Sequence, residues 1–600
     1  MSQPPIGDYA LVGDCHGAAL VSRLGSIDWC CLPRFDAGSC FGRLLGGERA
    51  GFCALELPEG WRCLHREYLE GTLVLATTLG NADQEFVVLD CLTMHEGGAR
   101  RPRHQILRVL EGRRGGARVR VRVVPRFDYG EVRPWLRPHG EGVFTAIGGN
   151  DALVVTGDAP LQIVDQHDLE AVVEVRAGER VRLSIEAVRP EDIDVEPPDP
   201  VPPDELDARL EETVEWWRRW SAGGSFEGSA AAAVKRSAIV LKALTYAPTG
   251  AIVAAPTTSL PETPGGSRNW DYRYSWVRDS TYGVRALAEL GHEAEADGFR
   301  RFITRSAAGH ADDLQIVFGV GGERRLTEFE HPFLDGYRRS RPVRIGNAAA
   351  EQLQLDVLGE LVNHVWRWHR RGNRLDEDQW RFLRDVVDAA ASRWREPDSG
   401  LWESRGDPRH FVHSKAACWC ALDRGLRLAE ELDGEAPLDR WRRERDELRT
   451  AIEERGVDRR RGNFVGEFDS EQIDAGLLLL PVMGFVAFDD PRMVATVDAV
   501  REDLGHDGLL RRYRGGDGPD GEEGAFLACS FWLVECLAEQ GRHDEAREVF
   551  DRAAATANDV GLFSEEYDAK RDELLGNFPQ ALTHLSHIAA AVALSRPAQR

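Results

Sequence analysis

The feature that most constrains this chain is a change in hydrophobic period near residue 200. Before it, short runs rich in Val, Leu, Thr and Ile are separated by Gly, Asn or Asp, a pattern typical of β-strands. After it, apolar residues recur every three to four positions, which is the period of amphipathic helices. A chain of 600 residues is also too long for one ordinary domain. The sequence therefore predicts a β domain followed by an α domain.

The strand spacing predicts an antiparallel β-sandwich over residues 1–200. The stretch VEPPDPVPPDELD (195–207) lies at its end. Proline fixes φ and has no backbone N–H, so we expect this stretch neither to continue a strand nor to begin a long helix. We interpret it as the linker to a second domain over residues 225–600.

Twelve segments of the second domain have a helical period. They cover residues 229–247, 276–290, 293–308, 347–371, 376–395, 412–433, 438–455, 469–480, 490–504, 524–541, 543–558 and 579–595. Mostly short turns follow the even-numbered segments, whereas long connections precede them. Helices that alternate in direction would place every long connection on one face. Six such hairpins closing into a ring predict an (α/α)6 barrel with a funnel on that face, where sites usually lie.

The composition narrows the classes of partner. The net charge of −25 disfavours nucleic acid and anionic membranes, because both require basic patches. No apolar run is long enough to cross a membrane, and the first residues do not resemble a secretory signal. The 11 cysteines include no C-x-x-C pair, so we interpret them as buried, reduced thiols of a cytoplasmic protein. We expect a neutral or cationic small molecule as partner and leave the oligomeric state open, a homo-oligomer included.

The long connections are rich in aromatic, acidic and Arg residues. The first contains NWDYRYSWVRDS (269–280), the third LWESRG (401–406) and the sixth GLFSEE (561–566). Aromatic rings stack on the apolar faces of a sugar, and charged side chains pair with its hydroxyl groups. The sequence has no Gly-rich phosphate loop, nucleophile elbow or H-E-x-x-H zinc motif. The connections therefore predict a carbohydrate site.

Hydrolysis of a glycosidic bond requires one protonated and one ionised carboxyl group. Glu403 directly follows Trp402. Desolvation by the indole would raise the pKa of this carboxyl group, which suits a general acid.

Several motifs in a fixed order resemble glycoside hydrolase family 15, the family of glucoamylases and bacterial trehalases. They are DYALVGD…GSIDW in the β domain, then NWDYRYSWVRDS, LWESRG and GLFSEE…GNFPQA. The resemblance covers nearly the whole chain. It implies a β-sandwich followed by an (α/α)6 barrel, and hydrolysis of an α-glucosidic bond at a non-reducing glucose with inversion.

The same resemblance implies that Glu403 is the general acid and Glu565 the general base. The family places its base in Pro-Glu-Gln, but here Ser564 and Glu566 flank Glu565. Glu566 is therefore an alternative base. The pair 522–523, Glu-Glu, is a further rival because it also precedes an inner helix.

The terminal glucose is expected in a subsite built from two motifs. Trp276-Val-Arg278-Asp279 resembles the Trp-x-Arg-Asp that grips it, and Arg341-Pro-Val-Arg344 resembles an Arg-Pro-x-Arg segment beside it. Glucoamylases continue the second motif with Asp-Gly-Pro, whereas this chain continues with Ile-Gly-Asn, which favours the trehalase branch. The full predicted binding set is Trp270, Tyr274, Trp276, Arg278, Asp279, Arg341, Arg344, Trp402 and Lys415.

Structural roles compete with these assignments. Arg278 and Asp279 also suit an ion pair at a helix N-terminus. Lys415, in the first turn of a helix, either reaches the acid loop or substrate, or forms a buried ion pair. His410 and His413 lack a third ligand, so no metal is predicted. The segment 29–36 either packs at the domain interface, which we prefer, or walls the funnel through Trp29, Arg34 and Asp36.

We therefore expect an inverting exo-acting α-glucosidase, first of all a trehalase. Glucoamylase or isomaltose-type activity on short α-glucans is the alternative. A phosphorylase on a similar barrel would not need Glu565, and a non-catalytic sugar-binding protein would need neither carboxylate. Some trehalases of the resembled family depend on phosphate or magnesium, but the sequence shows no site for either, and no cofactor is predicted.

Overall fold

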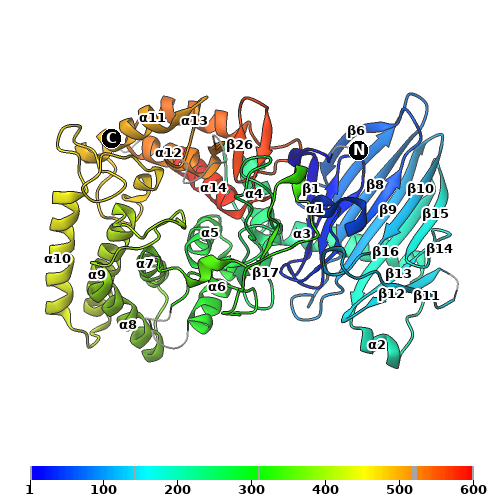
Figure 1. Cartoon of the computed structure of the whole chain (residues 1–600), viewed down its shortest axis with the longest axis horizontal. Coiled ribbons are helices and arrows are strands. Elements are labelled where there is room, and N and C mark those ends of the chain that lie inside the picture. The colour runs from blue at the N-terminus through cyan, green and yellow to red at the C-terminus, as the bar shows by residue number, and fades with distance from the viewer. Residues whose placement is uncertain (1–2, 141, 308–310, 312–313, 515–522, 597–600) are drawn as a thin grey trace.

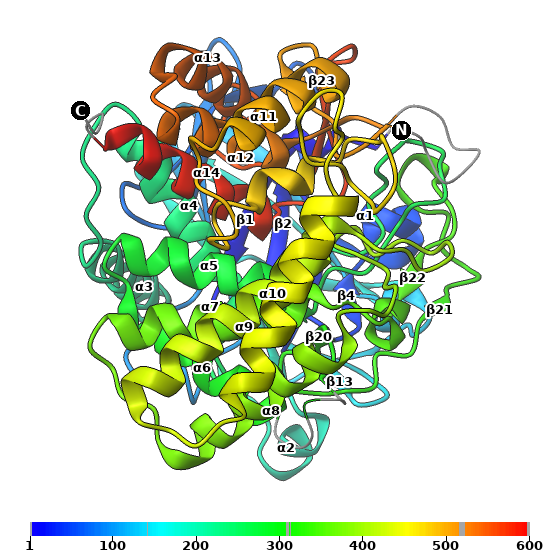
Figure 2. The ribbon, with the colours of Figure 1, turned by 90° about the vertical axis from the view of Figure 1, so that its left-hand side faces the viewer.

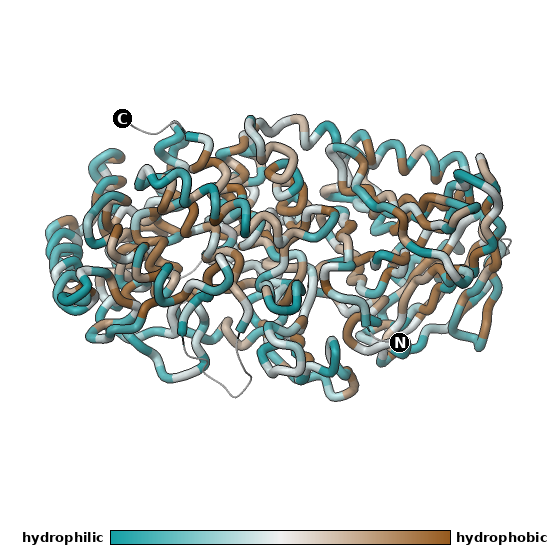
Figure 3. The backbone as a smooth tube through the Cα atoms, turned by 90° about the horizontal axis from the view of Figure 1, so that it is seen from above, coloured by the Kyte–Doolittle hydropathy of each residue, from teal (hydrophilic) through white to brown (hydrophobic). Residues whose placement is uncertain are grey.

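The computed structural model describes residues 3–140, 142–307, 311, 314–514 and 523–596. A β domain and an α domain lie side by side along the longest axis of the molecule (Figure 1). Apolar residues concentrate inside both domains, whereas the outer turns are mostly polar (Figure 3). The predicted order of an antiparallel β domain followed by a helical domain is confirmed.

Two antiparallel sheets of eight strands each make up the β domain. The first sheet contains β1 (Tyr9–Gly13), β2 (Ala18–Ser22), β3 (Ile27–Cys31), β4 (Ser39–Phe41), β5 (Phe52–Glu56), β10 (Gly116–Val124), β14 (Gln162–Val164) and β15 (Asp168–Arg176). The second contains β6 (Arg62–Tyr68), β7 (Leu75–Gly80), β8 (Glu85–Leu92), β9 (Gln105–Arg114), β11 (Trp135–Pro138), β12 (Val143–Gly148), β13 (Asp151–Gly157) and β16 (Arg180–Val188). Strands such as β15 alternate buried and more exposed residues, which is why the spacing was readable from the sequence.

The Pro-rich stretch does not behave as predicted. A helix of 19 residues, α3 (Pro203–Ser221), begins inside it, after the short helix α2 (Pro190–Val195). Proline is tolerated at the first helical position, because the N–H groups of the first turn have no intrahelical acceptor. The acidic side chains of Asp204 and Glu205 follow at once and favour the positive end of the helix dipole. The expectation that no long helix begins here was therefore wrong.

Helices dominate the second domain. Its main elements are α4 (Ala231–Ala243), α5 (Val277–Glu289), α6 (Glu293–Ser306), α7 (Asp356–Arg370), α8 (Glu377–Arg393), α9 (Val412–Leu432), α10 (Leu438–Arg455), the 3-10 turn η7 (Ala475–Leu479), α11 (Pro491–Leu504), α12 (Leu527–Glu539), α13 (His543–Ala554) and α14 (Ala581–Ser595). The elements α5, α7, α9, η7, α12 and α14 touch one another in that order, and α14 touches α5 again. The contacts thus close a ring, and the other helices pack around it (Figure 2).

Two predicted helices are shorter in the structure. The segment 347–371 becomes helical only at Asp356, after the 3-10 turn η6 (Ala348–Glu351). The segment 469–480 contains only η7, at whose start the Asp474 side chain accepts a hydrogen bond from the Gly476 backbone N–H. Pro481 follows and disfavours a longer helix. All residues of η7 are buried, so its apolar sequence does not distinguish a short 3-10 turn from a longer helix.

Short strand pairs stiffen the long connections of the helical domain. They are β17 (Thr245–Tyr246), β18 (Ala251–Ile252), β19 (Ser275–Trp276), β20 (Val317–Phe318), β21 (Phe329–Glu330), β22 (Arg344–Ile345), β23 (Gly505–His506), β24 (Leu509–Leu510), β25 (Ala525–Phe526), β26 (Glu566–Asp568) and β27 (Glu573–Leu575). Pairing between β25 and β26 holds the fifth connection against the sixth.

All 11 cysteines are free thiols; Cys63 is half-buried and the others are buried. In the described part of the chain, no helix combines the length and the apolar character needed to cross a bilayer.

Candidate active site

A cavity of about 280 Å³ opens among the long connections. Residues from the first, second, third, fifth and sixth connections line it. The ring of helices thus brings together segments that are more than 300 residues apart in sequence. Of the predicted site residues, seven line the cavity: Trp270, Trp276, Arg278, Asp279, Trp402, Glu403 and Glu565.

Glu403, the predicted acid, is held by residues of the first connection. Its Oε1 accepts a hydrogen bond of 2.6 Å from Trp276 Nε1, and Arg278 Nη2 lies 3.4 Å away. The backbone of Glu403 has φ 57°, in the left-handed region that side chains other than Gly rarely adopt. The third connection therefore bends sharply at this residue and directs its carboxylate at Trp276 and Arg278.

The indole beside Glu403 in sequence does not hold its carboxylate. Trp402 Nε1 donates to both carboxylate oxygens of Asp474, at 2.9 and 2.8 Å. Burial raises the pKa of Asp474 to about 6. The indole N–H that reaches the Glu403 carboxylate belongs to Trp276 instead. The desolvation of Glu403 by Trp402 stays a prediction.

Glu565, the predicted base, lies on the sixth connection and lines the same cavity. Its Oε1 accepts a hydrogen bond of 2.7 Å from the hydroxyl group of Tyr272. Gly576, with φ +74°, passes so close that an added Cβ would lie 2.6 Å from Glu565 Oε2. Glycine at this position therefore leaves space for the carboxylate, and a larger residue would displace it.

Both predicted catalytic carboxyl groups have raised pKa values. Burial raises the pKa of Glu403, and the Arg278 guanidinium counteracts part of that effect. Burial and the nearby Glu262 carboxylate raise the pKa of Glu565 to about 8, although Arg512 and Tyr272 oppose the shift. Burial is the largest cause of the shift, so the ionised form of Glu565 is disfavoured by its surroundings.

A network of carboxylates and guanidinium groups lies behind Glu565. Arg512 binds Glu262 through a short contact and Glu523 through bonds of 3.0 and 3.1 Å. Arg268 forms a close ion pair with Glu523 and lies 3.7 Å from Glu262. Glu566 is fully buried, and neither of its oxygens accepts a hydrogen bond from any described residue.

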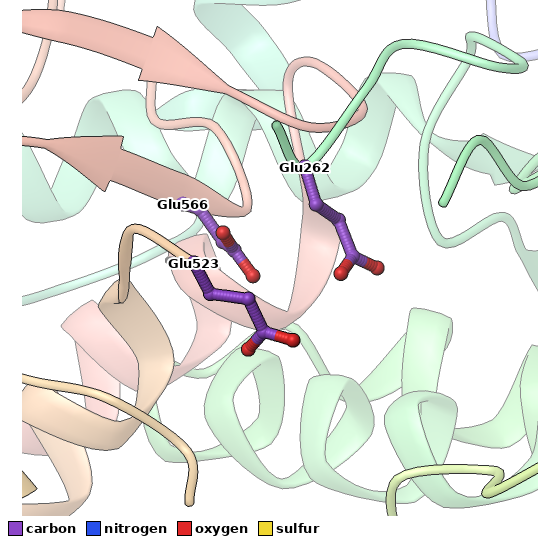
Figure 4. A group of neighbouring side chains, drawn as sticks. All are labelled: Glu262, Glu523 and Glu566. Atoms are coloured by element: carbon purple, nitrogen blue, oxygen red, sulfur yellow. The ribbon is translucent and has the colours of Figure 1, made fainter. Parts of the chain in front are cut away.

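Three of these acids point toward one another: Glu262, Glu523 and Glu566 (Figure 4). Their ligand atoms lie within 4.8 Å of one another, and no other such group of acids, His or Cys occurs among the described residues. However, Trp270 and Arg512 already bind the two oxygens of Glu262, and Arg512 binds both oxygens of Glu523. A metal ion would have to compete with two guanidinium groups, so we assign none.

Four predicted binding residues do not line the cavity. Tyr274 is buried beside it, and Arg341 is exposed and pairs with Asp335. Arg344 lies outside the lining but stacks on Trp270, with its guanidinium carbon 4.4 Å from a ring centroid. The buried ammonium group of Lys415 donates to the backbone carbonyl oxygen of Glu396, at the start of the third connection, so it contacts the connection that carries Glu403 and does not line the cavity.

The remaining alternatives from the sequence are resolved in part. Trp29 donates to the Pro256 carbonyl oxygen at 2.8 Å, and Arg34 binds Glu323 at 2.9 Å. This is packing at the domain interface, and neither residue lines the cavity. Of the rival base pair, Glu523 is tied to two Arg side chains, whereas position 522 lies outside the described residues.

Sequence reasoning missed Tyr272, Glu262, Arg405 and Arg512, all of which line the cavity. Tyr272 lies inside the quoted motif NWDYRYSWVRDS, so the motif could have indicated it. Glu262 lies in a Pro- and Gly-rich stretch with no periodic pattern, and only the ring closure brings it to Arg512.

Comparisons with known proteins agree with this geometry. The family described as "Glycosyl hydrolases family 15" matches residues 228–592, and "Trehalase-like, N-terminal" matches residues 1–186. The chain is 38% identical over 625 residues to a trehalase of Mycolicibacterium smegmatis, covering 99% of this chain and 92% of that protein. It is 33% identical over 605 residues to a trehalase of Thermoplasma volcanium, covering 98% and 93%.

The fold has a solved counterpart as well. A crystal structure of a bacterial glucoamylase complexed with acarbose matches with a TM-score of 0.73 at 11% identity, covering 99% of this chain and 94% of that one. At that identity the likeness shows the shared fold alone. The family match, by contrast, spans more than half of the chain, and the resemblance drawn from the loop motifs is confirmed. The protein belongs to glycosyl hydrolase family 15 and is a glycoside hydrolase.

Proposed function

We propose that the protein is an inverting trehalase, which hydrolyses α,α-trehalose to one β-glucose and one α-glucose. The observation that supports it most is that Glu403 and Glu565, from the third and sixth connections, line one cavity together with Arg278 and Asp279. Relatives aligned over nearly the whole chain are trehalases, which supports trehalose as the substrate.

In this mechanism the terminal glucose is bound by Arg278 and Asp279. Arg278 is fixed by Gln354 at 3.0 Å and Asp356 at 3.2 Å, so its guanidinium is held in one orientation. Asp279 Oδ1 is buried and lies 3.4 Å from Arg278 Nε, but it accepts no hydrogen bond from the described residues, so it can accept one from a sugar hydroxyl. Such contacts hold the ring in the geometry of the transition state.

The bond changes then follow from the two carboxyl groups. Glu565 removes a proton from a water molecule, whose oxygen attacks C1 of the bound glucose. The bond between C1 and the bridging oxygen breaks, and Glu403 gives its proton to that oxygen. The attack from the opposite face inverts C1, so the glucose that receives the water oxygen is released as β-glucose, whereas the other glucose leaves as α-glucose.

Glu565 is the favoured base because it lines the cavity and its carboxylate is oriented by Tyr272. Glu523 is held in two ion pairs, and Glu566 is fully buried outside the lining. A phosphorylase would require an anion in place of the base, whereas this position already holds a carboxylate. Glucoamylase-type hydrolysis of short α-1,4- or α-1,6-glucans is the alternative within the same mechanism.

Product release from trehalose, maltose, isomaltose and starch, measured side by side, tests the substrate. We expect the highest kcat/KM with trehalose and poor activity on starch. A higher kcat/KM on long maltooligosaccharides than on every disaccharide would overturn the assignment. Proton NMR of the first turnovers should show β-glucose accumulating at the rate at which the bond is cleaved. If α-glucose alone appeared first, inversion would be excluded.

We also propose the cellular compartment of the enzyme and whether it holds a cofactor. Eleven free thiols are compatible with a reducing compartment, so we place the enzyme in the cytoplasm. We propose no resident cofactor. Dialysis against a chelator should leave trehalose hydrolysis unchanged, and loss of activity that magnesium restores would contradict this.

A further inference from the structure

Four carboxyl groups crowd the wall of the cavity that holds the proposed base. They belong to Glu262, Glu523, Glu565 and Glu566, and two guanidinium groups, of Arg268 and Arg512, lie among them. Four negative charges against two positive ones leave a surplus of two in a buried region. Unpaired buried charge is costly, so protons or a cation must compensate for part of it.

The hydrogen bonds show which of the four carboxyl groups is most easily protonated. Glu262 and Glu523 accept bonds from Arg512, and Glu565 accepts one from Tyr272, and each of these bonds favours an ionised carboxylate. Glu566 has no such donor. It is fully buried, both its oxygens lack hydrogen-bond partners, and its nearest guanidinium nitrogen, Arg512 Nη2, is 3.7 Å away.

Backbone pairing fixes the side chain in this position. Glu566 lies in β26 opposite Phe526 of β25, and its Oε2 lies 3.3 Å from where a Cβ of Gly524 would be. The other ionisable group of α12 that faces it is the buried thiol of Cys529, whose pKa burial raises, so it adds no charge. The side chain points at Glu262 and Glu523 (Figure 4).

We propose that Glu566 is a positioning residue that stays a neutral carboxylic acid throughout the working pH range, so that the adjacent base Glu565 can ionise. The role in catalysis rests on the proposed function, since it takes Glu565 as the base. The protonation of Glu566 itself does not depend on it. If Glu566 were ionised, its negative charge would raise the pKa of Glu565 still further.

The first test is thermal stability as a function of pH, comparing wild type with Glu566→Gln. An acid whose folded pKa is raised contributes stability below its unfolded pKa and loses it as pH rises toward the folded value. Burial and Glu262 raise the pKa of Glu566 well above its ordinary value. We therefore expect the Tm of E566Q to exceed that of wild type by a margin that widens from pH 5 to pH 8. A lower Tm of E566Q at pH 8 would show an ionised Glu566 paired with Arg512 and overturn the proposal.

Glu523→Gln is the matched control. It has the same chemical change in the same cluster, but it removes a partner of two Arg side chains. It should lower Tm at neutral pH, and by less as the pH falls. Should E566Q not accumulate as a folded protein, Glu566→Met offers a second uncharged side chain for the same comparison.

A divalent cation is the competing way to offset the charge. If 5–10 mM Mg²⁺ or Ca²⁺, roughly 10- to 100-fold above a weak site's dissociation constant, raised the Tm of wild type but not of E566Q, a cation would hold the place that we assign to a proton. That outcome would overturn the proposal. Equal Tm values with the cation and with a chelator would support it.

The last test uses activity. The acid limb of kcat/KM reports the essential base of the free enzyme. E566Q should leave the midpoint of this limb in place, because a neutral group is exchanged for another. Glu262→Gln removes an ionised neighbour of Glu565 and should move the midpoint down by about one pH unit. A comparable fall in E566Q would overturn the proposal. If trehalose is not hydrolysed at all, the proposed function fails, whereas the Tm comparisons still decide the state of Glu566.

Discussion

The two proposed catalytic carboxyl groups lie in contrasting electrostatic surroundings. Glu403 faces donors, the indole N–H of Trp276 and the guanidinium of Arg278. Glu565 accepts from the Tyr272 hydroxyl group and the Asn577 backbone. However, the carboxyl groups of Glu262 and Glu566 lie near it, and the Arg512 guanidinium only partly offsets them. Burial raises both pKa values, but Arg278 restrains the shift of Glu403, whereas Glu262 adds to the shift of Glu565. The difference shows that the residue next along the chain does not decide how a carboxylate ionises.

The strongest way to sharpen this comparison is to remove each carboxylate in turn. Glu565→Gln should lower kcat by about 10²–10⁴-fold on trehalose and on α-glucosyl fluoride alike, because both need the activated water. Glu403→Gln should lose a similar factor on trehalose but retain much of its turnover of the fluoride, whose leaving group needs no proton. Glucose release from trehalose and from α-glucosyl fluoride, measured at fixed times for each variant, compares the two losses of turnover.

Azide supplies the control for the base. An external anion can replace the activated water, so it should restore turnover of the fluoride by Glu565→Gln. If Glu523→Gln abolished turnover while Glu565→Gln did not, the base would have been assigned to the wrong residue.

Asp279→Asn tests the side of the cavity that binds the glucose. The amide keeps the shape of the side chain, but it has no negative charge and has an NH₂ group in place of one oxygen. It therefore holds the glucose hydroxyl less well, and kcat/KM should fall by about 10²-fold. We expect KM to rise, kcat to fall, and circular dichroism to match that of wild type. Arg278→Ala should act in the same direction. Wild-type kinetics in either variant would remove that residue from the site.

Tyr272→Phe removes the hydroxyl donor to Glu565. A hydrogen bond to a charged group is worth roughly 1.5–3 kcal/mol, so kcat/KM at neutral pH should fall by roughly tenfold or more. The bond favours the ionised carboxylate. Its loss therefore raises the pKa of Glu565 and moves the acid limb of kcat/KM to higher pH. A limb that did not move, measured over pH 5–9, would show that Tyr272 acts in some other way.

Trp402→Phe should affect stability more than chemistry. The variant leaves the buried Asp474 without its indole donor, which costs about 1–3 kcal/mol in the free energy of unfolding. Glu403 keeps its bonds to Trp276 and Arg278, so the ratio of activity on trehalose to activity on the fluoride should stay close to that of wild type. A selective loss on trehalose would restore a direct role for Trp402 in acid catalysis.

Arg341→Ala should have the smallest effect. The side chain is exposed and pairs with Asp335 outside the cavity, and surface ion pairs contribute about 0–1 kcal/mol. We expect kcat/KM on trehalose within about twofold of wild type, which corresponds to about 0.4 kcal/mol and lies inside that range. A tenfold rise in KM would place Arg341 in the glucose subsite after all.

Much of this protein could be predicted because local patterns repeat. Apolar and polar residues alternate in runs such as ARVRVRVVP, and a helical period follows the linker. These local patterns predict a β domain followed by an α domain. Pro203 was misjudged because proline is excluded from helix interiors but not from the first turn. The helix predicted over 469–480 is reduced to the 3-10 turn η7, because Pro481 closely follows the apolar run and disfavours a longer helix.

The sequence by itself determined the fold class, the family and which connections carry Glu403, Glu565, Arg278 and Asp279, since those depend on short motifs. The tertiary structure decided which groups surround each carboxylate: Trp276 rather than Trp402 beside Glu403, and Glu262, Arg512 and Glu566 around Glu565. The reason is physical. Ionisation depends on charges, donors and burial within a few ångströms, and the ring of helices brings those neighbours from segments hundreds of residues apart.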